Sequence, residues 1–152
     1  MSNLTDYKNI WVFIETECGK PKNVGYELLN VAKPLAETKG CELVAVVIGN
    51  NIENVAKDAI CYGADSAIIV DREEYEMYTT DAFAKALTAL VEKYKPETLM
   101  IGATNNGRDL GPRVSCRLKT GLTADCTGID IDEETGNVAW TRPTFGGNLF
   151  GT

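Results

Sequence analysis

The sequence predicts an α/β fold: an open, mostly parallel, twisted β-sheet with helices on both faces and a C-terminal β-hairpin. Short apolar runs rich in β-branched residues alternate with longer segments whose apolar residues recur every three or four positions. This alternation of strand and helix is typical of parallel sheets with right-handed crossover connections. Near the C-terminus, a polar turn at residues 132–137 separates two strand-like runs, which indicates the hairpin.

Five segments are expected to form the strands of the main sheet: residues 9–15, 41–48, 66–70, 98–103 and 123–131. The first is a nearly unbroken apolar run, as in strands buried on both faces. The first and fourth segments are among the most apolar of the five, which favours central positions for them and the strand order 3-2-1-4-5. The returning strand of the hairpin is expected at residues 138–142.

Four segments are expected to be helices: residues 24–39, 52–60, 81–95 and 108–119. Gly40 follows the first of them, at the position where glycine commonly ends a helix. Thr80 is the predicted N-cap of the third helix, and Pro96 ends it.

The charge and the residue usage of the chain exclude several functions. Its 22 acidic and 15 basic residues leave a formal net charge of −7, which disfavours binding to nucleic acid. Histidine is absent, which excludes histidine general bases, Ser-His-Asp and Cys-His nucleophile pairs, and the commonest metal ligand. We therefore expect neither a catalytic site nor a metal site in this chain.

The cysteines indicate a reducing compartment. There are five of them, an odd number, and no two are spaced as CxxC. Reduced thiols in the cytoplasm are the simplest interpretation. No apolar stretch approaches the roughly 18 residues that a membrane span needs, so none is expected.

A ligand site is expected beyond the carboxyl ends of the strands, where the strand order reverses, between the loops at residues 15–23 and 102–108. The second loop carries Gly102 and Gly107, and the helix after it offers free N–H groups to an anion. Its spacing fits neither a P-loop nor the GxGxxG fingerprint. A strand-to-helix turn without a ligand explains the glycines as well. Nucleotide-binding modules of the universal-stress type share this fold, but Asn105 stands where they usually have a second glycine.

Several charged residues are further candidates. Arg108, Arg113, Arg117 and Lys119 form a local basic patch, which would receive a phosphate or an acidic partner, or would simply face solvent. Asp125 interrupts an apolar stretch and is expected to be a buried, structural carboxylate that pairs with Arg113 or with a backbone turn.

Four motifs occur in order: IWVFIE at residues 10–15, GAT followed by GRDLGPR within 102–113, GLTADCT at 121–127 and RPTFGGN at 142–148. Together they resemble the electron transfer flavoprotein alpha subunit, and the resemblance covers essentially all 152 residues. It implies that residues 1–152 are a single N-terminal α/β domain, followed in the full subunit by an FAD-binding domain absent from this chain. The chain stops inside a strand-like run, so we expect it to be part of a longer polypeptide.

The resemblance also implies partners. In this family the alpha subunit pairs with a beta subunit of related fold, which holds AMP or a second FAD. The heterodimer carries electrons from acyl-CoA dehydrogenases, other dehydrogenases or NADH through FAD. This chain would act there as a scaffold and subunit interface, with FAD bound mainly by other segments.

The last motif points to one cofactor-binding residue. RPTFGGN resembles versions from anaerobes, in which a second FAD bifurcates electrons and the motif's arginine lies near the ring of the beta-bound FAD. The resemblance therefore implies Arg142 as a cofactor-binding residue, although the residues alone favour a strand arginine paired with a surface acid. The alternative function is a free-standing adenine-nucleotide-binding module of the universal-stress type.

Overall fold

A four-stranded parallel sheet forms the centre of the computed structural model, which describes residues 6–143 and 150–151. Its strands are β1 (Ile10–Ile14), β4 (Leu43–Gly49), β5 (Ser66–Asp71) and β6 (Thr98–Ile101), in the order β5-β4-β1-β6. This confirms the first four positions of the predicted order 3-2-1-4-5. β1 and β4 are buried at every residue because they lie in the middle of the sheet and helices cover both of its faces.

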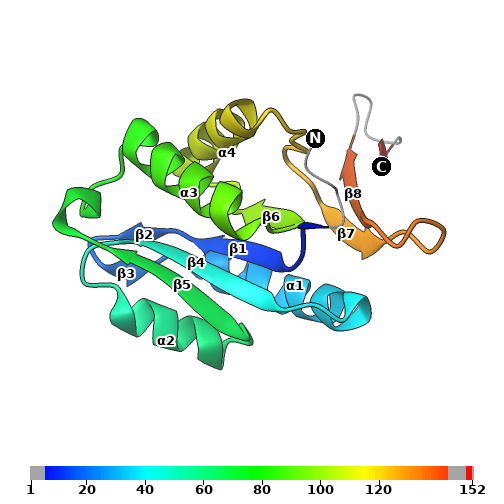
Figure 1. Ribbon diagram of the computed structural model, residues 1–152, viewed down its shortest axis with the longest axis horizontal. Helices are drawn as coiled ribbons and strands as arrows, with labels where there is room; N and C mark the ends of the chain where they lie inside the picture. Colours follow the sequence, from blue (N-terminus) through cyan, green and yellow to red (C-terminus); the bar gives the residue numbers. More distant parts are fainter. Residues whose placement is uncertain (1–5, 144–149, 152) are drawn as a thin grey trace.

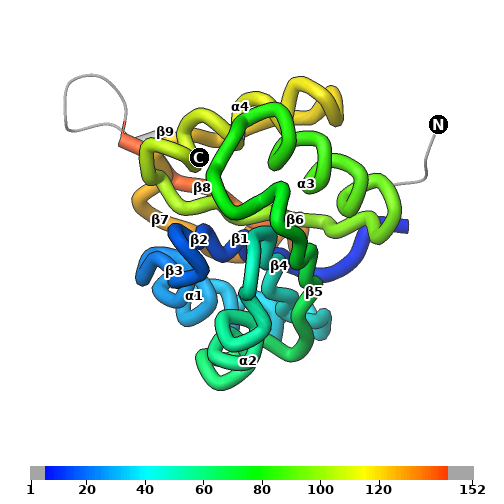
Figure 2. The backbone as a smooth tube through the Cα atoms, turned by 90° about the vertical axis from the view of Figure 1, so that its left-hand side faces the viewer, coloured from blue at the N-terminus to red at the C-terminus, as the bar shows by residue number. Residues whose placement is uncertain are grey.

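Two helices cover each face of the sheet, and Figures 1 and 2 show the three layers from two directions. α1 (Asn23–Lys39) and α2 (Glu53–Cys61) lie on one face, and α3 (Thr80–Tyr94) and α4 (Asn105–Leu118) lie on the other. The expected α/β class, with helices on both faces, is therefore confirmed.

The alternating side chains of β1 enter two separate hydrophobic cores. Ile10, Val12 and Ile14 pack into the core on the side of α1 and α2. Trp11 and Phe13 pack with residues of α3 and α4 on the opposite side. Successive residues of a strand point to opposite faces, so a strand at the centre of such a sheet must be apolar throughout.

The fifth predicted strand is wrong as a member of this sheet. Within the described residues, only Gly128–Ile131 (β7) of the segment 123–131 is a strand, and it belongs to a separate antiparallel sheet with β8 (Val138–Pro143) and β9 (Phe150–Gly151). Lys119 and Asp125 have φ angles of 54° and 53°, which interrupt extended backbone before β7. β7 pairs instead with the strand that a short turn brings beside it, because a short loop costs little entropy to close.

The predicted C-terminal hairpin is confirmed as β7 and β8, and Figure 1 shows it at one end of the main sheet. The Asp132 carboxylate accepts backbone hydrogen bonds from Glu134 and Thr135 (2.9 and 2.8 Å), which closes the turn. Three half-buried residues pack the hairpin against the core on the side of α1: Ile129, Ile131 and Trp140. The Lys39 ammonium group also donates to the Gly136 carbonyl (2.7 Å), so the turn is tied to α1.

Two helix starts differ from prediction. α4 begins at Asn105 rather than at residue 108, because the Thr104 hydroxyl accepts a hydrogen bond from the Gly107 N–H (3.0 Å) and caps the helix there. Thr80 was predicted to be the N-cap of α3, but Thr79 holds that position and Thr80 is the first helical residue. Gly40 ends α1 in the left-handed conformation, as predicted.

Three short elements complete the fold: β2 (Thr16–Glu17), β3 (Lys20–Pro21) and the 3₁₀ turn η2 (Glu73–Tyr75). β2 and β3 pair with each other in the loop that follows β1. Among the described residues, no helix is both long enough and apolar enough to span a membrane.

Asp65 links α1 to β4 and gives the fold an acid-sensitive contact. Its carboxylate accepts from the Lys33 ammonium group (2.7 Å) and from the Leu43 N–H (2.8 Å). These hydrogen bonds lower the pKa of Asp65 from its ordinary value of 3.8, and the bond from Lys33 has the largest effect. A carboxyl with a lowered pKa binds fewer protons in the folded chain, so it stabilises the fold above about pH 3.8 and loses this effect as the pH falls through the lowered pKa.

Asp65→Asn is therefore expected to make stability less dependent on pH between about pH 5 and pH 2. Urea unfolding at several pH values measures this slope. Asp58→Asn, at an exposed position of α2, is the matched control and should keep the parental slope. Parallel slopes for the parent and Asp65→Asn would contradict the assignment.

Candidate functional site

The expected ligand crevice lies at the carboxyl ends of β1 and β6. From β1 the chain proceeds to β4 and β5 on one side, and it then returns to place β6 on the other side of β1. The order therefore reverses between β1 and β6, and parallel sheets bind ligands at such points. The loops after these two strands meet here, as predicted.

A side chain of the protein itself fills this crevice. Glu15, the residue after β1, is only 6% exposed. One of its carboxylate oxygens accepts a hydrogen bond from the Thr104 hydroxyl, and the other accepts from the Asn106 amide (2.8 Å). The Lys22 ammonium group lies 3.0 Å from the same oxygen as Asn106 and completes an ion pair.

Glu15 places a carboxylate at the N-terminus of α4. Thr104 is the N-cap of α4 and Asn106 lies in its first turn, so the carboxylate is bound at a helix N-terminus, where anions are favoured. The hydrogen bond to Glu15 also raises the pKa of Lys22, which keeps that partner charged. A second anion at this place would have to displace a buried and fully paired carboxylate.

The glycines of the second loop serve packing rather than ligand approach. A Cβ on Gly107 would lie 1.8 Å from the Gly102 carbonyl oxygen, and a Cβ on Gly102 would lie 2.8 Å from Cγ1 of Val24. These positions let the first turns of α1 and α4 approach the end of β6. Of the two interpretations that the sequence left open, the structure supports the strand-to-helix turn.

The basic residues of α4 do not act as one patch. Arg108 pairs with Asp125 (2.9 Å), and Arg113 pairs with Asp81 at the start of α3 (2.6 Å). Arg117 instead lines a surface hollow between α3 and α4. The spacing of these residues along the helix predicted that they would project together. The ion pairs instead hold Arg108 and Arg113 against different partners.

The expectation that Asp125 is buried is wrong. Its side chain is 62% exposed, and its partner is Arg108 rather than Arg113. The apolar stretch around it is not a strand of the sheet, because the chain from 119 to 125 runs exposed over the surface. An aspartate tolerates the left-handed backbone that position 125 requires, which explains the residue type.

Sequence reasoning missed one polar cluster, at Asp109 of α4. The Tyr78 hydroxyl donates to this carboxylate (2.9 Å), and the Thr80 hydroxyl donates to the same oxygen. Burial, and to a smaller extent the hydrogen bond to Asp109, raises the pKa of Tyr78 to about 12, so the phenol keeps its proton. The cluster fastens the loop before α3 to α4. Residues about 30 positions apart carry no local signal for such a contact.

The cysteines give no sign of a metal site. None of the five is in a disulfide, and the described residues contain no cluster of metal-ligating side chains. Cys41 and Cys126 are half-buried, and burial raises the pKa of both thiols.

Arg142 lies exposed on β8, opposite Gly151 of β9. Burial raises the pKa of the Cys126 thiol, and the positive charge of Arg142 partly offsets this increase. The remainder of the RPTFGGN motif, residues 144–148, falls outside the described residues.

A sequence model described as the electron transfer flavoprotein domain matches residues 10–152. The chain belongs to the electron transfer flavoprotein family. This confirms the resemblance that the four motifs carried.

Curated relatives of this electron transfer flavoprotein domain are similar over nearly its whole length. It is 52% identical over 149 residues to an electron transfer flavoprotein subunit alpha of Thermoanaerobacterium thermosaccharolyticum, covering 98% of this chain and 45% of that protein. It is 50% identical over 150 residues to the subunit alpha of Clostridium acetobutylicum, covering 99% and 45%. It is 42% identical over 174 residues to an acryloyl-CoA reductase electron transfer subunit beta of Anaerotignum propionicum, covering 99% and 47%. The chain thus spans slightly less than half the length of these relatives.

Proposed function

We propose that this chain is the N-terminal α/β domain of an electron transfer flavoprotein alpha subunit, and that it serves as a scaffold and subunit interface. The observation that carries this proposal is the position of Glu15, which occupies the crevice at the carboxyl ends of β1 and β6. There it has three polar partners. A domain that fills its own anion site does not need a nucleotide there. The same observation counts against a free-standing nucleotide-binding module.

The partner in this proposal is a beta subunit, and the cofactor is FAD. FAD supplies transfer of one or two electrons when it is bound. The hollow between α3 and α4 and the hollow beside α2 and β5 both lie away from the carboxyl ends of β1 and β6. In this proposal FAD is held mainly by segments outside this chain, in a longer alpha subunit and its partner.

Arg142 is the residue of this chain that we assign to the flavin. It is exposed on β8, the returning strand of the C-terminal hairpin. A guanidinium stays charged at all working pH values, so it would stabilise the negative charge that a flavin gains on reduction. The redox partner enzyme would be an acyl-CoA dehydrogenase or a related enzyme that acts on acyl-CoA, since the Anaerotignum relative is named as an electron transfer subunit of an acryloyl-CoA reductase. The five free cysteines favour the reducing cytoplasm as its location.

Binding measurements on this chain test the proposed function. The purified chain is expected to be colourless in visible light and to bind neither AMP nor ATP with micromolar affinity in calorimetry. Mixing it with AMP at millimolar concentration should leave its melting temperature unchanged, since a ligand stabilises only the state that it binds. A stoichiometric yellow flavin in the purified chain would contradict the scaffold role. Micromolar binding of AMP would favour the nucleotide-binding alternative.

Arg142 is tested in the heterodimer that contains the full alpha subunit. Arg142→Gln is expected to lower the midpoint potential of the neighbouring flavin by about 60 mV, a tenfold change for one electron, because a cation that favours reduction is removed. Arg142→Lys is the matched control and should retain most of the parental potential, since it keeps the charge. Spectroelectrochemical titration gives all three values. Equal potentials in the three proteins would remove Arg142 from the flavin site.

A further inference from the structure

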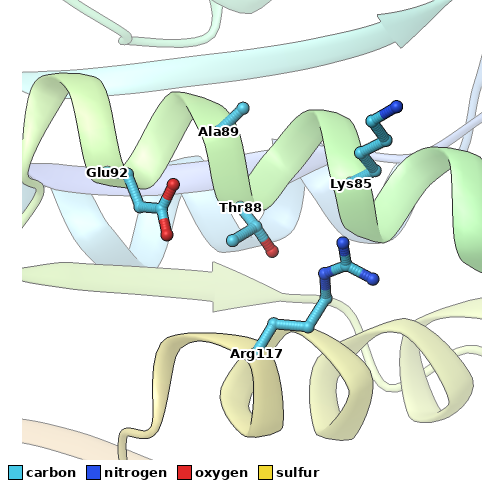
Figure 3. Close-up of a pocket in the computed structure, with 5 residues that line it drawn as sticks. All are labelled: Lys85, Thr88, Ala89, Glu92 and Arg117. Carbon is cyan, nitrogen blue, oxygen red and sulfur yellow. The ribbon is translucent and has the colours of Figure 1, made fainter.

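The hollow between α3 and α4 has the composition of a ligand site that the proposed function does not use. It measures about 410 Å³, within the range of small-molecule pockets. Lys85, Thr88, Ala89 and Glu92 line it from α3, and Arg117 lines it from α4. Figure 3 shows the guanidinium of Arg117 reaching from α4 towards α3, with Glu92 farther along α3 beyond Thr88.

The two cations of the hollow lack counterions. Arg108 and Arg113, on the same helix as Arg117, each pair with an aspartate. Neither Arg117 nor Lys85 makes an ion pair with any residue in the described part of the chain, and Glu92, although it lines the same hollow, lies beyond ion-pair distance of both. In a chain of net charge −7, two unpaired cations at one hollow form a local attraction for an anion.

Thr88 gives an independent sign of a missing partner. It is only 7% exposed, and its hydroxyl oxygen is buried without a hydrogen-bond partner among the described residues. A threonine within a helix commonly bonds the carbonyl four residues earlier, and buried hydroxyls are almost always satisfied. Figure 3 shows this oxygen on the side of α3 that faces Arg117. A rotation of the Thr88 side chain about χ1 would bring this hydroxyl out of its buried position towards a group held by Arg117.

We propose that this hollow binds a phosphate-class oxyanion, either free phosphate or the phosphate of a small monoester. Arg117 would hold it through two parallel N–H bonds, a geometry that suits tetrahedral oxyanions. The Thr88 hydroxyl would donate a third bond. Figure 3 shows the Lys85 ammonium extending away from Arg117, and the flexible lysine stem allows it to close over the bound anion. Glu92 opposes the binding by like charge and limits the affinity. This site does not depend on the proposed electron-transfer role.

Amide NMR of the isotopically labelled chain tests the proposal, with sodium phosphate and glycerol 3-phosphate as two separate probes at constant ionic strength. We expect saturable shifts, in the low millimolar range, confined to amides around Lys85, Thr88, Ala89 and Arg117. Glycerol 3-phosphate that binds more tightly than phosphate would identify a monoester as the ligand. Glycerol 3-phosphate that binds less tightly than phosphate would identify free phosphate, and equal affinities would show that the site recognises the phosphate group alone.

Four variants locate the site. Arg117→Gln is expected to weaken phosphate binding about tenfold, and Thr88→Val about threefold, through lost charge-assisted bonds. Glu92→Gln should strengthen it about threefold by removing a repelling charge. Lys93→Gln, on the same helix but outside the hollow, is the matched control and should bind as the parent does.

Thr88→Val should melt no earlier than the parent, because the hydroxyl it removes has no hydrogen-bond partner in the described part of the chain. Weaker binding by this variant would therefore not reflect misfolding. Shifts that never saturate, or saturable binding that survives both Arg117→Gln and Thr88→Val, would overturn the proposal.

Discussion

Gly107→Ala is expected to destabilise the fold by about 3 kcal/mol or more. Its Cβ would lie 1.8 Å from the carbonyl oxygen of Gly102, far inside contact distance. The obstacle is backbone at the end of β6, so the clash is relieved only if the first turn of α4 moves away from the sheet. That movement would also separate Thr104 and Asn106 from Glu15.

Gly111→Ala is the matched control for this prediction. It lies one turn later on the same helix, where the nearest atom to a new Cβ is Cδ1 of Leu122 at 3.8 Å, an ordinary contact. Alanine is the better helix former, but a Cβ directly before Pro112 is disfavoured in a helix, so the two effects oppose each other and this variant should stay within about 1 kcal/mol of the parent. Urea unfolding of both variants measures the difference. If Gly107→Ala unfolds within about 1 kcal/mol of the parent, helix α4 does not pack against β6 as described.

Glu15→Gln is expected to destabilise the fold by about 2–3 kcal/mol. The glutamine side chain has one acceptor oxygen in place of two, so it is unable to accept from both Thr104 and Asn106. It also removes the counterion of Lys22. A buried donor left without a partner accounts for most of the expected loss.

Glu17→Gln separates this effect from the general removal of an acid. Glu17 lies two residues away on β2, and its carboxylate approaches the same ammonium group of Lys22 at 3.8 Å, but its side chain is 76% exposed. Exposed pairs contribute little, so the change should stay within about 0.5 kcal/mol. Chemical unfolding at neutral pH compares the two variants. Equal losses would show that the cluster around Glu15 is not a distinct structural element.

These two predictions connect stability with function. Gly107 and Glu15 lie where an α/β fold usually offers its ligand site, yet both serve the packing of α1, α4 and the ends of β1 and β6. A crevice made rigid in this way suits a scaffold, because it holds the first turns of α1 and α4 against the ends of β1 and β6. In the proposed alpha subunit, the electron-transfer chemistry would belong to FAD and to other segments.

Much of the fold could be predicted because its signals are local. The apolar run of β1 and the helical spacing after it are readable within a few residues, and right-handed crossovers then restrict the order of the strands. The site of the crevice followed from that order. The same local method failed at residues 123–127, where apolar composition suggested a strand but the left-handed backbone at Asp125 prevents one.

The sequence by itself determined the α/β class, the order of the first four strands, the hairpin and, through four motifs, the family. Only the tertiary structure decided that Glu15 fills the crevice, that Arg108 takes Asp125 as its partner, and that Arg117 and Thr88 face a shared hollow. The reason is physical. Strands and helices follow from the preferences of neighbouring residues, whereas Glu15 and Asn106 are 91 positions apart and meet only after the sheet has formed.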